Sequence, residues 1–402
     1  MLPSSLLHPL RNARRTTVFL ITILGCAACA TAPQQLPQVA GGAPVTFDDY
    51  ADFGPRPAMP SRDDIFYLSP EQRSDFLSYY NASEHSGVDK HRRITNYLHR
   101  FGEAFNYQGD TFTAEQTMAA QGGNCMSMAV LTTALANVVD VEVGYQLVDS
   151  IPVYELEDNL AFKGQHVRSY LFDPDYQPTD SSLMVIRRPG IIVDYFPSGR
   201  EHFIGNITED AYVAMFYRNR AANALAEEDF NSAYWYLRES MVYAPEHADA
   251  INTLAVLHRR VGDAQRAEAL YEYGLEIEVE TVSLVKNYRN MLRLQGREDE
   301  ASALEDQLHT LDDPSPFNWL SLAREAHDAE NFALAVRMYD KTLDVAPYLQ
   351  DAHLGKVQAQ LDMGQIAEAA TSLDTATEYM YREDERSMYI AKLSTLRGKL
   401  VD

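Results

Sequence analysis

A repeat with a period of 34 residues runs through the second half of the chain and restricts what that half can fold into. At this spacing a small residue recurs within stretches that are otherwise apolar or aromatic. The recurring residues are Ala233, Ala267, Ala301, Ala335 and Ala369. A unit of this length is a pair of helices, and a small residue lets its two helices approach closely. No pair can bury its apolar face alone, so we expect neighbouring pairs to stack into a solenoid.

Other positions of each unit follow the same period. Twelve residues before the alanines lie Ala221, Ala255, Arg289, Ala323 and Val357, and four residues after them lie Leu237, Tyr271, Glu305, Tyr339 and Leu373. Pro245 and Pro347 fall where a second helix would end. This pattern resembles tetratricopeptide (TPR) repeats, so residues 206–402 are expected to form an all-α TPR solenoid of five repeats with a capping helix after Tyr379. Arg289 and Glu305 put the packing of the third repeat in doubt, because those positions are usually small or apolar.

The first residues have the pattern of an export signal. Arg14 and Arg15 precede the apolar run 18–25, which is shorter than the roughly 20 residues needed to span a bilayer. We therefore expect residues 1–25 to be a signal peptide. Residues 26–60 are rich in Pro, Gly and Gln and are expected to form a flexible tether.

The end of this signal resembles the lipobox of bacterial lipoproteins. Ile23 and Gly25 precede Cys26, which by this resemblance would carry the lipid and begin the mature chain. Ala27 stands where Asp would retain a Gram-negative lipoprotein in the inner membrane, so the resemblance implies an outer-membrane anchor facing the periplasm. An ordinary cleaved signal with incidental cysteines at positions 26 and 29 remains the alternative.

Charge and composition exclude one class of partner. The formal net charge is −24, and no Lys/Arg-rich block occurs beyond the extreme N-terminus, so nucleic-acid binding is not expected. A hydrophobic content of 46% is sufficient for folded cores. Of the three cysteines, Cys125 alone lies outside the signal and tether. A free cysteine in a folded domain is most often a small buried hydrophobe.

Residues 61–205 are expected to form an α+β domain. An amphipathic helix is expected over 87–105 and another after Thr113, a plausible cap. A third helix, capped by Asn124, is apolar on nearly all sides and should lie at the centre of the domain. The expected strands are 141–148, 166–172, 183–188 and 190–196.

Cys125 occupies the first turn of that central helix. Unpaired N–H groups and the helix dipole favour an anion there, which predicts a lowered thiol pKa and a more nucleophilic sulfur. Gly122 and Gly123 would allow a substrate to approach the backbone closely, and the N–H of Cys125 would face a developing oxyanion.

A nucleophilic cysteine needs a base and a group that orients the base. His166 begins one predicted strand and Asp194 lies on another, so antiparallel pairing of these strands would bring imidazole and carboxylate together. The competing histidines are His85, His91, His99 and His202. A metal site is disfavoured, because Cys125, His166 and Asp194 show no ligand-pair spacing.

The segments GGNCMSMAVLTTALA, QHVRSYLFD and IIVDYFP resemble the transglutaminase-like domain of the papain-type fold. This resemblance covers residues 90–200 and implies a papain-like domain with Cys125 as nucleophile, His166 as general base and acid, and Asp194 as orienting group. It also suggests Gln121 as an oxyanion donor. No acidic loop can be assigned as a calcium site, and no cofactor is expected.

Two functions follow from these patterns. In the first, Cys125 attacks a peptide or carboxamide bond, and water or an amine resolves the thioester, while the repeats bind a protein or peptide on their concave face. In the second, the repeats form a non-catalytic adaptor at the membrane, and the thiol domain is degenerate. Rapid labelling of Cys125 that depends on His166 would favour the first.

Overall fold

A computed structural model describes the chain from Phe53 onward, in several ranges. These are residues 53–107, 109–149, 155–156, 160–161, 166–177, 188–195, 202–277, 281–379, 390 and 393–394. The predicted signal peptide, the lipobox with Cys26 and most of the predicted tether lie outside the described residues. Residues 43–402 form one compact unit, which holds both an α/β region and a helical array.

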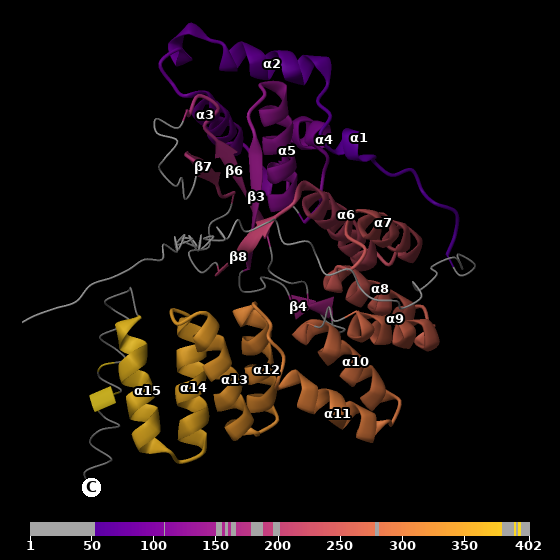
Figure 1. Ribbon diagram of the computed structural model, residues 1–402, viewed down its shortest axis with the longest axis vertical. Helices are drawn as coiled ribbons and strands as arrows, with labels where there is room; N and C mark the ends of the chain where they lie inside the picture. Colours follow the sequence, from indigo (N-terminus) through magenta and orange to yellow (C-terminus); the bar gives the residue numbers. More distant parts are fainter. Residues whose placement is uncertain are drawn as a thin grey trace, which may run out of the picture. The chain divides into compact units, whose positions relative to one another are not determined.

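The α/β region contains short helices around a four-stranded antiparallel sheet (Figure 1). Its helical elements are α1 (Arg62–Ile65), α2 (Pro70–Tyr80), the 3-10 turn η1 (Ser83–His85), α3 (Lys90–Gly102), α4 (Ala114–Ala120) and α5 (Cys125–Val138). The strands are β1 (Asn106–Tyr107), β2 (Gly122–Gly123), β3 (Val143–Asp149), β4 (Glu155–Leu156), β5 (Leu160–Ala161), β6 (His166–Phe172), β7 (Gly190–Val193) and β8 (His202–Ile207). The strand order of the main sheet is β7-β6-β3-β8, and α5 packs against β6.

Local capping explains where several of these helices begin. Thr113 accepts a hydrogen bond from the backbone N–H of Gln116, whose side chain accepts from the N–H of Thr113. Asn124 caps α5 by accepting from the N–H of Ser127, at 3.0 Å. Such reciprocal pairs satisfy N–H groups that the first helical turn leaves unbonded. Both predicted caps are therefore confirmed.

Most predicted elements of the α/β region are confirmed, with differences at the sheet edges. The helices expected over 87–105, after Thr113 and after Asn124 are α3, α4 and α5. The strands over 141–148, 166–172 and 190–196 are β3, β6 and β7. The remaining predicted strand, 183–188, is not tested, because residues 183–187 lie outside the described residues. The edge strand β8 was not predicted, because its pairing with β3 shifts register between Leu147 and Val148 and its side chains do not alternate regularly.

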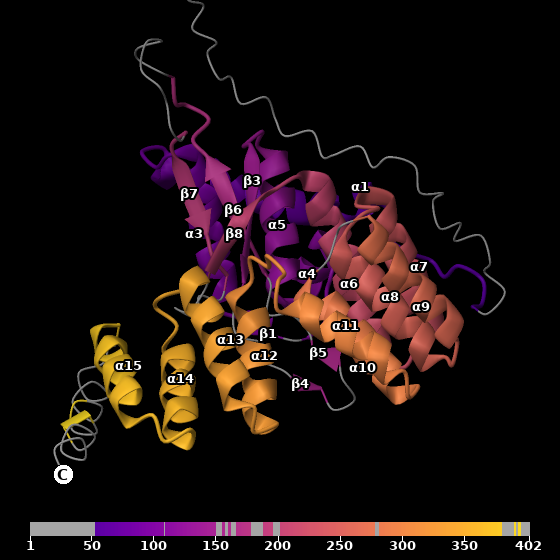
Figure 2. The same ribbon diagram turned by 60° about the horizontal axis from the view of Figure 1, so that its bottom comes forward.

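The second half of the chain is a series of helix pairs (Figure 2). The helices are α6 (Glu209–Ala226), α7 (Phe230–Tyr243), α8 (Ala248–Arg260), α9 (Ala264–Glu276), α10 (Val282–Leu294), α11 (Glu298–Leu308), α12 (Pro316–Asp328), α13 (Phe332–Val345), α14 (Gln350–Asp362) and α15 (Ile366–Glu378). The two helices of each successive pair contact each other, from α6 with α7 to α14 with α15. Helices α7 and α13 end just before Pro245 and Pro347, as predicted.

The periodic small residues lie where the helices of each pair meet. The five alanines at the 34-residue period are all fully buried. In the third pair, Arg289 replaces a small residue and is 1% exposed. Its guanidinium donates to Glu305 at 2.7 Å and also pairs with Glu325. The two residues that departed from the repeat pattern therefore compensate each other, because the cation and the carboxylate occupy facing positions.

The last part of the array is described only in part. The predicted capping helix after Tyr379 lies outside the described residues except for positions 390 and 393–394. Leu393 is buried in a cluster with Val357 and Leu373, so this residue packs against the final helix pair. Within the described ranges, no helix is long and apolar enough to cross a membrane.

Helix α6 belongs to both regions. Tyr212 at its beginning is fully buried and stacks on Tyr145 of β3, with ring centroids 4.2 Å apart. Further along α6, Arg220 donates to the carbonyl of Thr111 at 2.8 Å. The α/β region and the first helix pair therefore share a continuous core.

Candidate functional site

The cysteine predicted as nucleophile is the first residue of α5. Its neighbour Asn124 is held by two further hydrogen bonds, from its Nδ2 to Thr111 Oγ1 at 2.7 Å and to the carbonyl of Gly109 at 3.1 Å. These contacts fix the entry of the chain into the central helix. Cys125 as a whole residue is partly exposed, while its sulfur lies in a largely desolvated environment.

The two glycines before this helix have a structural role that differs from the predicted one. Gly122 and Gly123 are buried and form β2, which pairs in parallel with β1. Gly123 has φ +135°, and a Cβ there would lie 2.5 Å from Ser127 Oγ. The chain's own Ser127 thus occupies the space beside Gly123 that was expected to admit a substrate.

The thiol of Cys125 has a raised pKa, not the lowered one expected at a helix N-terminus. Burial raises the pKa of this thiol to about 11, and the Asp194 carboxylate adds to the increase. Hydrogen bonds from the backbone N–H groups of Met126 and Cys125 lower it, as the helix terminus predicts, but by less. Desolvation exceeds the helix effect, so the environment of the sulfur favours the thiol over the thiolate.

The strands that carry the other two predicted residues pair as expected. Strands β6 and β7 are antiparallel neighbours, with Ser169 opposite Val193. Asp194 follows β7 and pairs with Arg168 of β6, with 3.5 Å between Nη1 and Oδ2. The backbone of His166 begins β6 opposite Val148, and the position of its side chain lies outside what the structure describes. Cys125 and Asp194 therefore lie at neighbouring elements of one region.

Gln121 and the competing histidines occupy varied positions. Gln121 is exposed, adopts φ +47° at the end of α4, and accepts the N–H of Asn106 through its carbonyl. His91 is buried and faces Asp173, with 3.7 Å between Nδ1 and Oδ1. His202 begins strand β8, which was not predicted, and its ring Nδ1 lies 3.1 Å from Tyr348 Oη. No group of His, Cys, Asp and Glu in the described ranges has metal-binding geometry.

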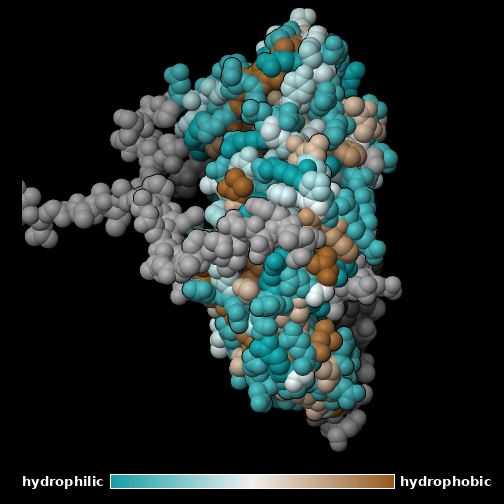
Figure 3. Space-filling view, turned by 90° about the vertical axis from the view of Figure 1, so that its right-hand side faces the viewer, coloured by the Kyte–Doolittle hydropathy of each residue, from teal (hydrophilic) through white to brown (hydrophobic). Residues whose placement is uncertain are grey.

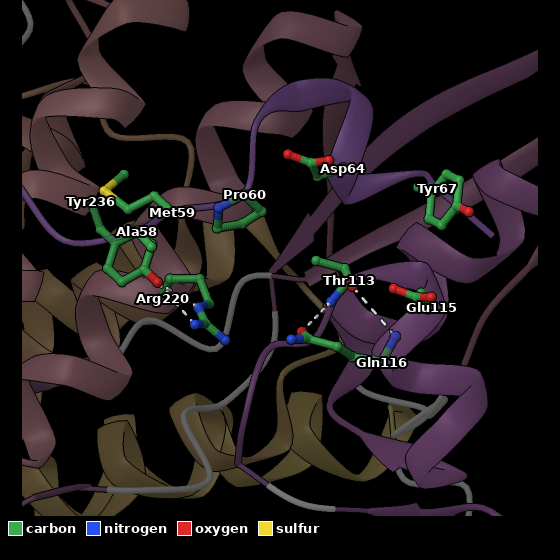
Figure 4. Close-up of a pocket in the computed structure, with 10 residues that line it drawn as sticks. All are labelled: Ala58, Met59, Pro60, Asp64, Tyr67, Thr113, Glu115, Gln116, Arg220 and Tyr236. Atoms are coloured by element: carbon green, nitrogen blue, oxygen red, sulfur yellow. Dashed lines mark hydrogen bonds between the residues drawn. The ribbon is translucent and has the colours of Figure 1, made fainter. Parts of the chain in front are cut away.

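A cavity of about 380 Å³ lies away from the cysteine (Figure 4). Its walls come from the segment before α1, from α1 and the residues after it, from the start of α4, and from helices α6 and α7. The lining residues are Ala58, Met59, Pro60, Asp64, Tyr67, Thr113, Glu115, Gln116, Arg220 and Tyr236. Arg220 and Tyr236 are hydrogen-bonded to each other on one side. None of the three predicted catalytic residues lines this cavity, so it is a separate feature.

The first helices of the repeats form a second candidate site. Helix α8 contacts α10, α10 contacts α12, and α12 contacts α14, so these helices build one continuous face. Polar side chains link them: Asn287 Nδ2 donates to Asn252 Oδ1 at 2.9 Å, and Lys286 pairs with Glu325 at 2.8 Å. We call this surface the first-helix face.

Three observations identify the type of helical array: its helices form pairs, the pairs repeat every 34 residues, and the periodic alanines are buried. The array is TPR-like.

The solved structures that resemble this chain include other TPR proteins. Pseudomonas aeruginosa PilF has 17% identity and a TM-score of 0.31, covering 48% of this chain and 87% of PilF. Yeast Tom70 has 18% identity and a TM-score of 0.34, covering 46% of this chain and 40% of Tom70. A tetratricopeptide repeat protein from Parabacteroides merdae has 18% identity and a TM-score of 0.28, covering 46% of this chain and 74% of its own.

These scores are low, and the TPR-like assignment depends on the repeat period and the helix pairs instead. No protein-family pattern and no curated protein matches the chain.

Proposed function

We propose that this protein is a scaffold that binds a protein partner on the first-helix face of its TPR-like array. The contacts between successive first helices carry the proposal, because they join separate repeats into one surface long enough for an extended polypeptide. That surface is polar, with amide, hydroxyl and charged groups from several helices, and these suit the hydrogen-bonding groups of a peptide backbone.

At least one face of the folded unit offers little surface for nonspecific hydrophobic association. The face in Figure 3 is largely hydrophilic, and the hydrophobic residues visible on it occur in small separate groups. The net charge of −24 also disfavours nonspecific association with anionic molecules.

Site-specific photo-crosslinking tests this proposal. A photoreactive amino acid at Asn287, on the first-helix face, is expected to crosslink a discrete partner in the native host, because this position is partly exposed and lies among the polar side chains that link α8 and α10. Leu294 is a matched control at the end of the same helix and is 76% exposed. Identical crosslinks at both positions, or none at position 287, would contradict the proposal.

We also propose a location for the scaffold. The lipobox resemblance supports acylation of Cys26 and an outer-membrane anchor facing the periplasm, with the tether joining the anchor to the folded unit. Metabolic labelling with an alkyne-bearing fatty acid tests this: labelling is expected in the wild-type chain and not in Cys26→Ser. Equal labelling of both chains would reject it.

A second candidate function is acyl chemistry at Cys125. The observation that favours it is the placement of Cys125 at the start of α5 near Asp194, beside the strand that His166 begins. In this function the sulfur attacks a carboxamide, an amine or ammonia leaves, and water or a second amine resolves the thioester. The raised thiol pKa weighs against it, since it disfavours the thiolate, which is the nucleophilic form.

Mass spectrometry separates this candidate from a purely non-catalytic scaffold. Incubation with a glutamine-containing peptide should give a thioester adduct on the wild-type chain that is absent in Cys125→Ala. No adduct at any pH up to 9, despite intact folding, would leave the scaffold as the sole function.

A further inference from the structure

Residues 53–60, Phe-Gly-Pro-Arg-Pro-Ala-Met-Pro, have neither helix nor strand structure and run past α7 to α1 (Figures 1 and 2). We call this segment the strap. It forms the end of the predicted flexible tether, yet it is held by specific side chains of the first helix pair. The proline residues restrict its backbone to extended conformations, which lowers the entropy lost on docking.

Two hydrogen bonds to consecutive strap carbonyls fix its backbone. Trp235 Nε1 donates to the carbonyl of Gly54 at 3.0 Å, and Asn231 Nδ2 donates to the carbonyl of Pro55 at 3.1 Å. The two donor residues, Asn231 and Trp235, lie one helical turn apart on α7. Sites that recognise extended, proline-containing peptides typically use a tryptophan and an amide to donate hydrogen bonds to the peptide carbonyls.

Two side chains of the strap make the contacts that distinguish its sequence. The Phe53 ring is 8% exposed and stacks on Tyr234, with centroids 4.2 Å apart and planes at 10°. The Phe53 ring also makes a T-shaped contact with His258 of α8, with ring centroids 5.4 Å apart. Arg56 pairs with Glu239 at 2.6 Å and lies over the ring of Trp235.

The fit leaves one buried acceptor of this surface unsatisfied. Asn231 Oδ1 is buried and has no hydrogen-bond partner in the described part of the chain. It lies beside Gly54, 3.4 Å from where a Cβ would stand. The docked strap therefore supplies no donor to this oxygen, and an unsatisfied buried acceptor costs free energy in the docked state.

We propose that the surface of α7 and α8 formed by Asn231, Tyr234, Trp235, Glu239 and His258 is a peptide-binding site whose resident ligand is the strap, and that a peptide of the same sequence can replace it. The ligand class is an extended segment with an aromatic residue, a glycine, prolines and an arginine. The hydrogen bonds, the ion pair and the ring stacking described above use side chains of α7 and α8, so the strap can leave without disrupting the backbone hydrogen bonds of these helices. Release would lengthen the tether by up to about 28 Å, from its eight residues.

Fluorescence anisotropy with a labelled peptide of residues 50–61 tests the proposal on the full-length chain. The double variant Phe53→Ala/Arg56→Ala weakens the resident strap and leaves the site intact, so it is expected to bind the peptide at least tenfold more tightly than the wild-type chain. Adding Asn231→Ala and Glu239→Gln to that variant should reverse the gain. A control peptide with alanine at positions 53 and 56 should not bind.

Equal binding of the peptide by wild-type and double-variant chains, or by neither, would overturn the proposal. Arg56→Ala alone provides a second readout if the double variant fails to fold, because it removes an ion pair whose arginine is 52% exposed. It should give an intermediate affinity, and wild-type affinity would again count against the proposal.

Discussion

Individual residues show where burial overrides local expectation. At Cys125 the helix terminus acts in the predicted direction, through the N–H groups of Met126 and Cys125, but desolvation raises the pKa more strongly. Sequence alone identifies the helix terminus, because Asn124 is a recognisable cap. It does not give the burial of the sulfur, which depends on residues distant in the chain.

The raised pKa predicts how the thiol reacts. The labelling rate of Cys125 by iodoacetamide should keep rising with pH up to about 11. A free thiol instead levels off above its pKa of about 8.5. The difference between the wild-type and Cys125→Ser chains isolates this site from Cys26 and Cys29. A plateau below pH 8 would show that a nearby base ionises the sulfur, and it would favour the acyl-transfer function.

Adding one methyl group at Gly123 is expected to lower the free energy of unfolding markedly. Gly123→Ala should destabilise the chain by about 1–3 kcal/mol, because φ is +135° and the new Cβ would clash with Ser127. Urea denaturation followed by circular dichroism measures this. Gly102→Ala is the matched control, since no atom lies within 4 Å of its added Cβ, and it should cost far less. Similar costs at both positions would contradict the packing described for β2.

At the scale of elements, sequence reasoning succeeded where a signal is local or periodic. The caps Thr113 and Asn124 start helices through contacts within four residues, and the 34-residue period places each helix pair. Strand β8 was not predicted, because buried and exposed side chains do not alternate regularly along it and its pairing with β3 shifts register. The docking of the strap was not predicted, because Pro and Gly are as frequent in flexible tethers as in docked segments. Its docking depends on side chains of α7, which are distant in the chain.

The third helix pair predicts coupled effects of two substitutions. Arg289→Ala should destabilise the array by about 3 kcal/mol, the low end for breaking a buried pair, because Glu305 is partly exposed. The double variant Arg289→Met/Glu305→Leu should lose less stability than the sum of the single variants Arg289→Met and Glu305→Leu, since it removes the facing charges together and fills the space, and Glu325 keeps Lys286 as a partner. Thermal unfolding of these two single variants and the double variant measures the coupling. Additive losses would show that the two side chains do not interact.

For the whole molecule, the shared core between the α/β region and the TPR-like array implies a single cooperative unit. Tyr212 is fully buried and stacks on Tyr145, and Arg220 hydrogen-bonds to the carbonyl of Thr111, so α6 is part of both regions. The sequence pattern predicts a boundary between residues 205 and 206, whereas residue 206 lies in β8 and the first repeat helix, α6, begins at Glu209. The pattern does not reveal that the first repeat helix also completes the preceding core.

Cooperativity between the two regions is therefore open to measurement. Tyr212→Ala should lower stability by about 3–5 kcal/mol, as for other large buried aromatic residues, and should shift the unfolding of both regions together. Hydrogen exchange in urea can follow β3 and α8 separately in the same sample. Val242→Ala on α7 is the control, because this side chain is 71% exposed and should change neither region. If Tyr212→Ala shifted only the exchange of β3, the TPR-like array would be independent of the α/β region, and release of the strap would then act on the array alone.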